Sequence, residues 1–338
     1  MTTVSQPDST THTALIDSIL DKLRDLYVFP EVAAEVEADI RSRRDRGEYD
    51  SLSLGELCPA LTEQMQAISH DKHLRVFYSD APRPVVEMNW GADEWYESMR
   101  LKGSLSNFGL QKVEILPGNI GYLDIRHFFM VSLAGDTVVA AMNFLAHTSA
   151  LIVDLRQCVG GDAATVALVI SYLFDEPVHL NDFYLREGNQ TFQSWTLPYV
   201  PGRRYGDKPV FVLTSDSTFS GGEEFSYDLK NLKRATIVGE TTKGGAHPGQ
   251  RYAISEQVEV CIPMGRAINP ISGTNWEGTG VTPDIELPQE QALDAAYQLA
   301  LREVLARIED QQSSPYKALR EEIEKHLEPT AENQEPRT

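Results

Sequence analysis

The chain has 338 residues, of which 41% are hydrophobic, and it carries a formal net charge of −20. This length allows one large domain or two to three smaller ones, each able to bury a core. The negative charge argues against a nucleic-acid partner, because no basic stripe is available to neutralise phosphates.

Membrane and metal functions also lack support in the sequence. No run approaches 18 apolar residues, and the polar N-terminus has neither the basic nor the apolar region of a secretory signal. We therefore expect a cytoplasmic protein with no membrane partner. Cys58, Cys158 and Cys261 are far apart and lack Cys/His ligand spacing, so we expect no disulfide framework, no metal and no cofactor.

The N-terminal part is predicted to be helical. Residues 1–12 are polar and are expected to be disordered. Between residues 13 and 70, three apolar stripes with helical spacing are separated by Pro30 and by the turn-forming segment 47–53. This pattern predicts a small helical N-terminal domain over residues 13–70.

The rest of the chain first favours strands and then alternates strands with helices. The expected strands are 74–78, 85–89, 113–116, 120–126, 149–155, 209–214 and 235–239, and the expected helices are 136–145, 162–174, 222–232 and 290–310. Residues 252–254 and 257–262 should form a closing hairpin. Buried strands alternating with helices predict an α/β domain with parallel strands over residues 71–312. Residues 313–338 should form a charged C-terminal helix and a flexible tail.

The segment 214–224 carries the strongest functional signal. Ser220 lies in Phe219-Ser-Gly-Gly-Glu223, between a predicted buried strand and a helix with acids in its first turn. A serine at such a turn exposes its hydroxyl beside free helix N–H groups, which is what a nucleophile and its oxyanion need. The same residues also fit an ordinary N-cap, with Glu223 completing a capping box.

Three further loops could supply the partners of a nucleophilic serine. His73 follows the helical domain in Asp71-Lys-His, and His247 lies in a glycine-rich loop. Gly160 and Gly161 follow a buried strand and could present N–H groups to an oxyanion. Glu277, next to an aromatic residue, could orient an imidazole. Each of these residues alone also fits a structural role, as a surface or buried histidine, a turn glycine or a loop acid.

Four ordered motifs together resemble the tail-specific protease family of serine peptidases. They are Asp154-Leu-Arg-x-x-x-Gly-Gly161, Thr214-Ser-x-x-Thr-Phe-Ser-Gly-Gly-Glu-Glu224, Val238-Gly-Glu-Thr-Thr-x-Gly-Gly-Ala-His-Pro-Gly249 and Gly278-x-Gly-Val-x-Pro-Asp284. The resemblance covers roughly residues 13–310 and implies a crotonase-like (ClpP/crotonase-type) α/β catalytic domain, preceded here by the small helical domain.

The chain departs from the family pattern in two places. Only about 45 residues separate the His73 motif from Ile120, too few for the PDZ domain that many members carry. Gly245 stands where the processing peptidases have the lysine of a Ser/Lys dyad, with Lys243 two positions away. The chain therefore looks closer to the tricorn-core and interphotoreceptor retinoid-binding-protein-like members, in which the resemblance places His73 as base and Glu277 as its orienting acid.

The resemblance implies a serine peptidase acting on peptides or protein tails. In this interpretation Ser220, His73 and Glu277 are catalytic, the N–H groups of Gly221 and of Gly160 or Gly161 hold the oxyanion, and Phe219 and His247 line the substrate pocket. Two alternatives stay open, because fold alone does not imply function. One is a non-catalytic module that binds an apolar, retinoid-type ligand, and the other is an enzyme that transfers acyl groups or modifies peptides. The sequence shows no interface from which an oligomeric state could be read.

Overall fold

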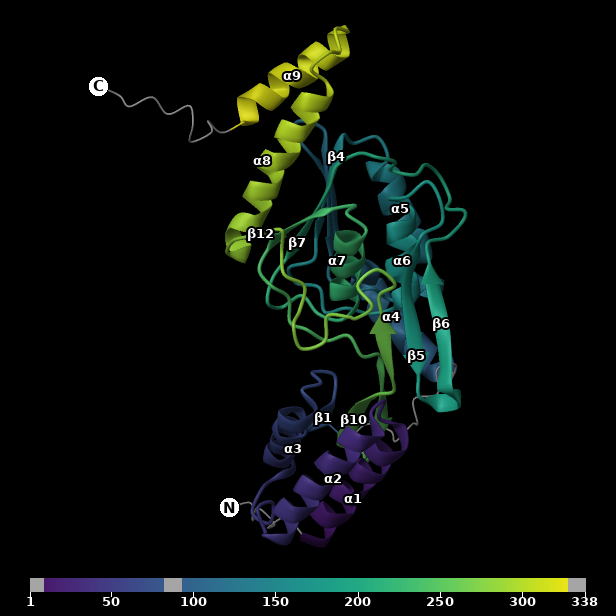
Figure 1. Ribbon diagram of the computed structural model, residues 1–338, viewed down its shortest axis with the longest axis vertical. Coiled ribbons are helices and arrows are strands. Elements are labelled where there is room, and N and C mark those ends of the chain that lie inside the picture. Colours follow the sequence, from purple (N-terminus) through teal and green to yellow (C-terminus); the bar gives the residue numbers. More distant parts are fainter. Residues whose placement is uncertain (1–8, 82–92, 328–338) are drawn as a thin grey trace, which may run out of the picture.

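The computed structural model describes residues 9–81 and 93–327 and shows an elongated molecule with three parts. A helical unit lies at one end, a sheet covered by helices follows, and the last helix of the described residues lies at the other end (Figure 1). Of residues 1–12, which were predicted to be disordered, residues 1–8 lie outside the described residues, as does the predicted strand 85–89. Among the described residues, no helix combines the length and the apolar character needed to cross a bilayer.

The helices are α1 (Ser9–Leu26), α2 (Pro30–Asp45), α3 (Leu54–Ser69), α4 (Asp93–Leu105), α5 (Val131–Leu145), α6 (Ala163–Ser171), α7 (Gly221–Asn231), α8 (Gln289–Arg307) and α9 (Ser314–His326). The strands are β1 (Arg75–Tyr78), β2 (Leu110–Leu116), β3 (Ile120–Ile125), β4 (Ala150–Asp154), β5 (His179–Leu185), β6 (Gln190–Trp195), β7 (Val210–Thr214), β8 (Thr236–Gly239), β9 (Gly249–Ala253), β10 (Val258–Pro263), β11 (Gly265–Ile268) and β12 (Ile285–Glu286).

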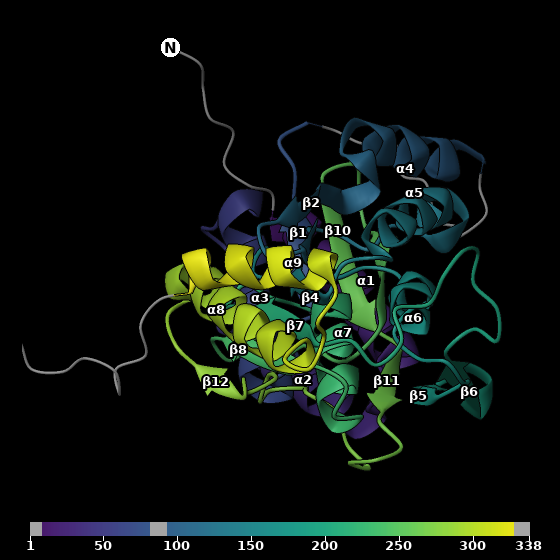
Figure 2. The ribbon, with the colours of Figure 1, turned by 90° about the horizontal axis from the view of Figure 1, so that it is seen from above.

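Within the described residues, the central sheet has the strand order β12-β8-β7-β4-β3-β2. Its strands are parallel except β2, which pairs antiparallel with β3. Helices α5, α6 and α7 cover one face and α8 with α9 covers the other, so the central strands are buried on both sides (Figures 1 and 2). This explains why β4 and β7 are continuous apolar runs, and it confirms the predicted α/β fold with parallel strands.

The helical unit is completed by strands from a distant part of the chain. The hairpin β9–β10, which sequence analysis predicted, pairs through β10 with β1 and packs its apolar side against the three N-terminal helices. Val258, Val260 and Ile262 are fully buried in the same core as residues of α1, α2 and α3. Residues 9–81 alone therefore do not contain the whole core of this unit.

Two predicted helix starts were wrong. Helix α1 begins at Ser9 rather than Thr13, and His12 is buried. Helix α5 begins at Val131, five residues before the predicted start at Asp136, so Gly135 lies inside the helix. The carboxylate of Asp162 accepts the Val131 N–H at 3.0 Å and thereby caps α5 from outside its own segment. A cap from a distant residue leaves no local sequence signal.

We expect Ile262→Ala to destabilise the protein by about 2–5 kcal/mol, because it removes a fully buried side chain from the shared core. Amide hydrogen exchange should accelerate in α1–α3, which lie about 200 residues earlier in the chain. The control is Thr191→Ala on the exposed strand β6. Unchanged exchange in α1–α3, together with a lower melting temperature, would show that the hairpin does not hold this unit.

Candidate active site

Ser220 lies at a strained turn between the central strand β7 and helix α7. It is the N-cap residue of α7 and has φ 52° and ψ −118°, a backbone conformation that is uncommon for a residue other than glycine. The first N–H groups of α7 have no acceptor within the helix and face this end. The Gly222 N–H bonds to the Phe219 carbonyl at 3.0 Å and the Glu223 N–H to the Ser220 carbonyl at 2.8 Å. Within the described residues, the turn therefore combines the Ser220 hydroxyl with one free backbone donor, the N–H of Gly221.

A second turn, after the neighbouring strand β4, lies directly against the serine. A Cβ atom on Gly160 would lie 2.6 Å from the Cβ of Ser220 and 2.8 Å from the nitrogen of Gly221. Gly160 has φ +96°, and its carbonyl accepts the Phe128 N–H at 2.8 Å. Gly161 follows, and its nitrogen lies 3.1 Å from the position of a Cβ on Gly221. The tertiary structure thus brings Gly160, Gly161 and Gly221 together beside Ser220.

The Asp154-Leu-Arg segment fixes this glycine turn. Asp154 binds Arg156 at 2.6 Å and accepts the Tyr122 hydroxyl at 2.7 Å. Burial raises the pKa of Asp154, but these partners outweigh it and hold the pKa below its usual value. Arg156 also donates to the carbonyl of Gln289 at the start of α8. The charged residues of this motif are therefore structural and anchor the end of β4.

The carboxylate of Glu223 ties the serine turn to the loop 242–245. One oxygen accepts the N–H groups of Ser220 at 2.8 Å and of Gly245 at 2.9 Å, and the other accepts the Thr242 hydroxyl and the Gly244 N–H. Glu223 is fully buried, and burial raises its pKa although all four donors favour the charged form. Sequence analysis assigned Glu223 only to a capping box, and its role in the loop was missed.

His73 reaches the serine turn through Phe219. The two rings stack with centroids 4.4 Å apart, and Phe219 directly precedes Ser220. A Cβ on Gly245 would lie 2.3 Å from the Phe219 ring and 2.9 Å from Cε1 of His73. The His73 and Phe219 rings therefore occupy the space that a side chain at position 245 would need. Lys243 lies near the same ring, with its Nζ 5.6 Å from the centroid of Phe219.

Behind His73 lies a hydrogen-bonded group of acids and a second histidine. Asp71 is fully buried and accepts three hydrogen bonds, from the backbone N–H of His73 at 3.0 Å, from His247 Nδ1 at 2.7 Å and from the Tyr27 hydroxyl at 3.2 Å. Glu277 accepts the Ala246 N–H, and its Oε2 lies 3.4 Å from His247 Nδ1. His247, predicted to line the substrate pocket, is thus buried and bonded to Asp71. Sequence analysis gave Asp71 no role, although its position two residues before His73 was a usable signal.

These environments move the pKa values of the group in different directions. Burial lowers the pKa of His73 to about 4, and the charge of Asp71 counteracts this only in part. Burial also opposes the charged form of His247. The hydrogen bond to Asp71 and the charge of Asp71 outweigh this effect, so the pKa of His247 is raised. Burial, followed by the charge of Asp71, raises the pKa of Glu277. His73 is therefore neutral at pH 7, as a general base must be.

The structure brings the predicted catalytic residues into one region without direct hydrogen bonds between them. Within the described residues, no hydrogen bond joins Ser220 to His73 or His73 to Glu277, and His73 Nδ1 and Glu277 Oε1 are buried without partners. A ring nitrogen of His73 lies within 4.8 Å of a Glu277 oxygen. Catalytic hydrogen bonds often tighten only when substrate is bound.

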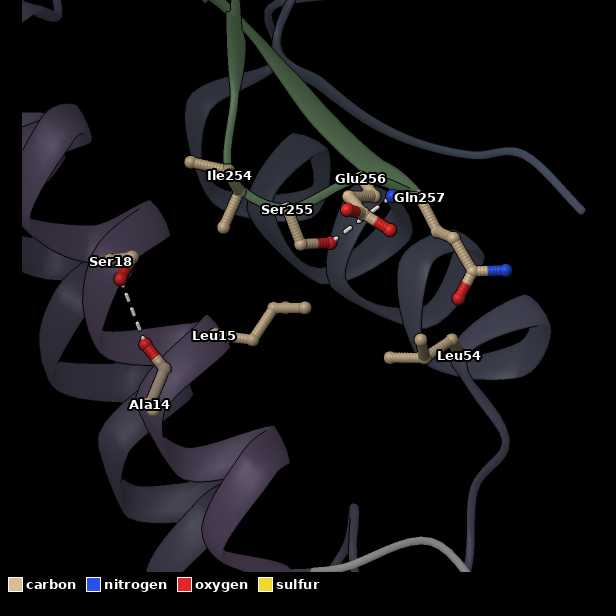
Figure 3. Close-up of a pocket in the computed structure, with 8 residues that line it drawn as sticks. All are labelled: Ala14, Leu15, Ser18, Leu54, Ile254, Ser255, Glu256 and Gln257. Atoms are coloured by element: carbon tan, nitrogen blue, oxygen red, sulfur yellow. Dashed lines mark hydrogen bonds between the residues drawn. The ribbon is translucent and has the colours of Figure 1, made fainter. Parts of the chain in front are cut away.

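A separate cavity of about 400 Å³ lies on the helical unit, between α1, the start of α3 and the β9–β10 turn. Leu15, Leu54 and Ile254 point toward it, together with the polar residues of the turn (Figure 3). It includes none of the predicted catalytic or oxyanion residues.

The parallel sheet and the paired glycine and serine turns define an α/β fold of the serine-peptidase class. The sequence profile of peptidase family S41 matches residues 119–287, and that of the N-terminal domain of peptidase S41 in eukaryotic IRBP matches residues 9–99. The chain therefore belongs to peptidase family S41, which confirms the family that the motifs indicated.

Individual relatives agree with this assignment. The chain is 25% identical over 190 residues to carboxyl-terminal-processing peptidase 2, chloroplastic, of Arabidopsis thaliana, and the match covers 52% of this chain and 34% of that protein. A lipoprotein structure from Streptococcus agalactiae has a TM-score of 0.56 and 16% identity, with 87% of this chain and 96% of that chain covered. The tricorn protease structure has a TM-score of 0.53 and 15% identity, with 93% of this chain and 37% of that chain covered. The two structures show a shared fold.

We expect Glu223→Gln to destabilise the protein by roughly 2–5 kcal/mol, because the amide cannot accept all four donors and leaves buried N–H groups unpaired. Chemical denaturation measures this effect. Glu240→Gln is the matched comparison, because Glu240 lies just before this loop, is half-buried and accepts only two backbone N–H groups. A loss no larger than that of the control would show that Glu223 does not clamp the serine turn.

Proposed function

We propose that this chain hydrolyses peptide bonds, with Ser220 as nucleophile, His73 as general base and Glu277 as the residue that orients His73. The observation that carries the proposal is the filled space at Gly245, where His73 and Phe219 exclude a side chain. The rings of Phe219 and His73 together fill the space that the side chain of a dyad lysine would need, which favours a Ser-His-Glu triad over a Ser/Lys dyad.

In the proposed reaction, Ser220 Oγ attacks the peptide carbonyl carbon while His73 takes the hydroxyl proton. The electron pair of the C=O bond moves to oxygen, which the N–H groups of Gly221 and of Gly160 or Gly161 stabilise, each by about 3 kcal/mol. His73 then gives the proton to the leaving amine. Water then attacks the acyl carbon while His73 takes a proton from it. The bond between that carbon and Ser220 Oγ breaks, His73 returns the proton to Oγ, and the carboxylic acid is released.

Glu277 is proposed to fix the tautomer of His73. His73 Nδ1 and Glu277 Oε1 are a potential donor and acceptor, both buried and both without a partner in the described residues. Leaving both unpaired is costly, so a small closure that joins them would satisfy two buried groups at once. The resulting hydrogen bond would also stabilise the imidazolium that forms during attack.

The proposed substrates are peptides or protein tails, the class to which the name of the Arabidopsis relative refers. The alternative of an apolar-ligand module is supported by the match to the N-terminal domain found in eukaryotic IRBP and by the cavity near Leu15. An enzyme that transfers the acyl group instead of hydrolysing it would show a coupled product in mass spectrometry rather than a free acid.

We expect Ser220→Ala to lower kcat/KM for a peptide library by roughly 10⁴-fold or more. A fluorophosphonate probe should label the unchanged protein and fail to label this variant. Ser217→Ala, an exposed hydroxyl three residues earlier, should behave as the unchanged protein. Undiminished turnover in Ser220→Ala would exclude the proposed nucleophile, and tight binding of an apolar ligand without any labelling would favour the module.

We expect Gly245→Ala to lower kcat by at least about tenfold, because its Cβ displaces His73 from Phe219 and a misplaced base costs about 10²-fold. Gly135→Ala is the control, since a Cβ there meets only Val131 at 3.9 Å. Circular dichroism should show that both variants are folded. Full activity of a folded Gly245→Ala would argue against His73 as the base.

A further inference from the structure

Asp71, His73 and Glu277 form a group with the geometry of a metal site. Each offers one ligand atom, and these atoms lie within 4.8 Å of one another. Imidazole and carboxylate groups are ordinary Zn²⁺ ligands, and with bonds of about 2.0–2.1 Å their atoms would lie roughly 3.3 Å apart around a tetrahedral ion. With the Asp71 carboxylate held in place, the His73 ring and the Glu277 carboxylate would have to turn toward it to reach that spacing.

Two atoms of the group are buried and have no partner in the described residues. These are His73 Nδ1 and Glu277 Oε1. The carboxylate oxygen can donate an electron pair to a metal, and Nδ1 can do so when the imidazole carries its proton on Nε2. The two carboxylates share His247 Nδ1, which lies 2.7 Å from Asp71 and 3.4 Å from Glu277, and a divalent cation would compensate the negative charge that remains.

The surroundings resemble the outer shell of a metal site. Asp71 accepts His247 Nδ1 at 2.7 Å and the Tyr27 hydroxyl at 3.2 Å, and these contacts fix the direction of its carboxylate. Hydrogen-bonded partners of this kind orient ligands and raise metal affinity. The ligands come from the turn after α3 and from the loop after β11, about 200 residues apart, so no sequence spacing could reveal the group.

We propose that Asp71, His73 and Glu277 bind one Zn²⁺ ion, and that this ion inhibits the peptidase by occupying its base and orienting acid. Binding itself rests only on the geometry, whereas the inhibition rests on the proposed function. Zn²⁺ would coordinate His73 and prevent it from taking the Ser220 proton. The ion is therefore a reversible inhibitor and takes no part in the reaction.

Binding is tested on the full chain carrying Ser220→Ala, which requires no peptidase activity. Competition with a fluorescent zinc chelator should show one tight equivalent, and Co²⁺ should give the visible absorption of a four-coordinate site. Glu277→Gln and His73→Gln, each added to this background, should weaken binding at least about tenfold. His70→Asn is the matched control, since His70 is exposed in the same turn and asparagine tolerates its φ of 55°.

Binding that survives both ligand variants, or that His70→Asn removes, would overturn the site. Absence of any tight equivalent would overturn it as well. Thermal melts identify a variant that fails to fold, and the Co²⁺ spectrum of the Ser220→Ala protein tests coordination without changing a ligand. In the active chain, one equivalent of Zn²⁺ should abolish peptide hydrolysis and EDTA should restore it. Hydrolysis unaffected by bound Zn²⁺ would overturn the inhibition, whereas Zn²⁺ binding in a chain without hydrolysis would count against the proposed function alone.

Discussion

The buried carboxylate of Glu223 is the interaction on which the arrangement of the site depends. It accepts four donors from two segments, the N-terminus of α7 and the loop 242–245. Each donor would be costly to leave unpaired in a buried place, so the serine turn and the loop are held in one relative position. Trp276 adds to this by donating its ring N–H to the Gly245 carbonyl at 2.8 Å. The space beside Ser220 is consequently defined before any substrate enters.

The helical unit carries part of the candidate site at its end, and its own core includes strands from the rest of the chain. Asp71 and His73 follow α3 directly, whereas Glu277 and His247 belong to the second half of the chain. The β9–β10 hairpin joins these halves, because it leaves the loop that carries His247 and pairs with the strand that follows His73. Packing of the N-terminal helices and placement of the proposed base therefore depend on the same hairpin.

Much of the fold could be predicted because apolar strands and amphipathic helices repeat along the chain. Strands β3, β4, β7 and β8 and helix α7 lie where the pattern placed them, since burial on both faces requires continuous apolar runs. Helix α4 and the β5–β6 hairpin were missed. Strand β6 is largely exposed and polar, so it lacks the hydrophobic alternation that marks a half-buried strand. The sequence also could not predict which strands pair with one another, because paired strands can lie far apart in the chain.

The sequence by itself determined the family, the strand-to-helix turn at Ser220 and the glycines that such turns require, because these features depend on local backbone geometry and on short motifs. It also indicated His73 and Glu277, through motifs at the two ends of the α/β region. Only the tertiary structure decided that Gly245 is small because His73 and Phe219 fill its space, that Glu223 binds two segments, and that Asp71 bonds to His247. These facts concern side chains far apart in the chain, whose distances are set by the packing of the whole molecule and by no local pattern.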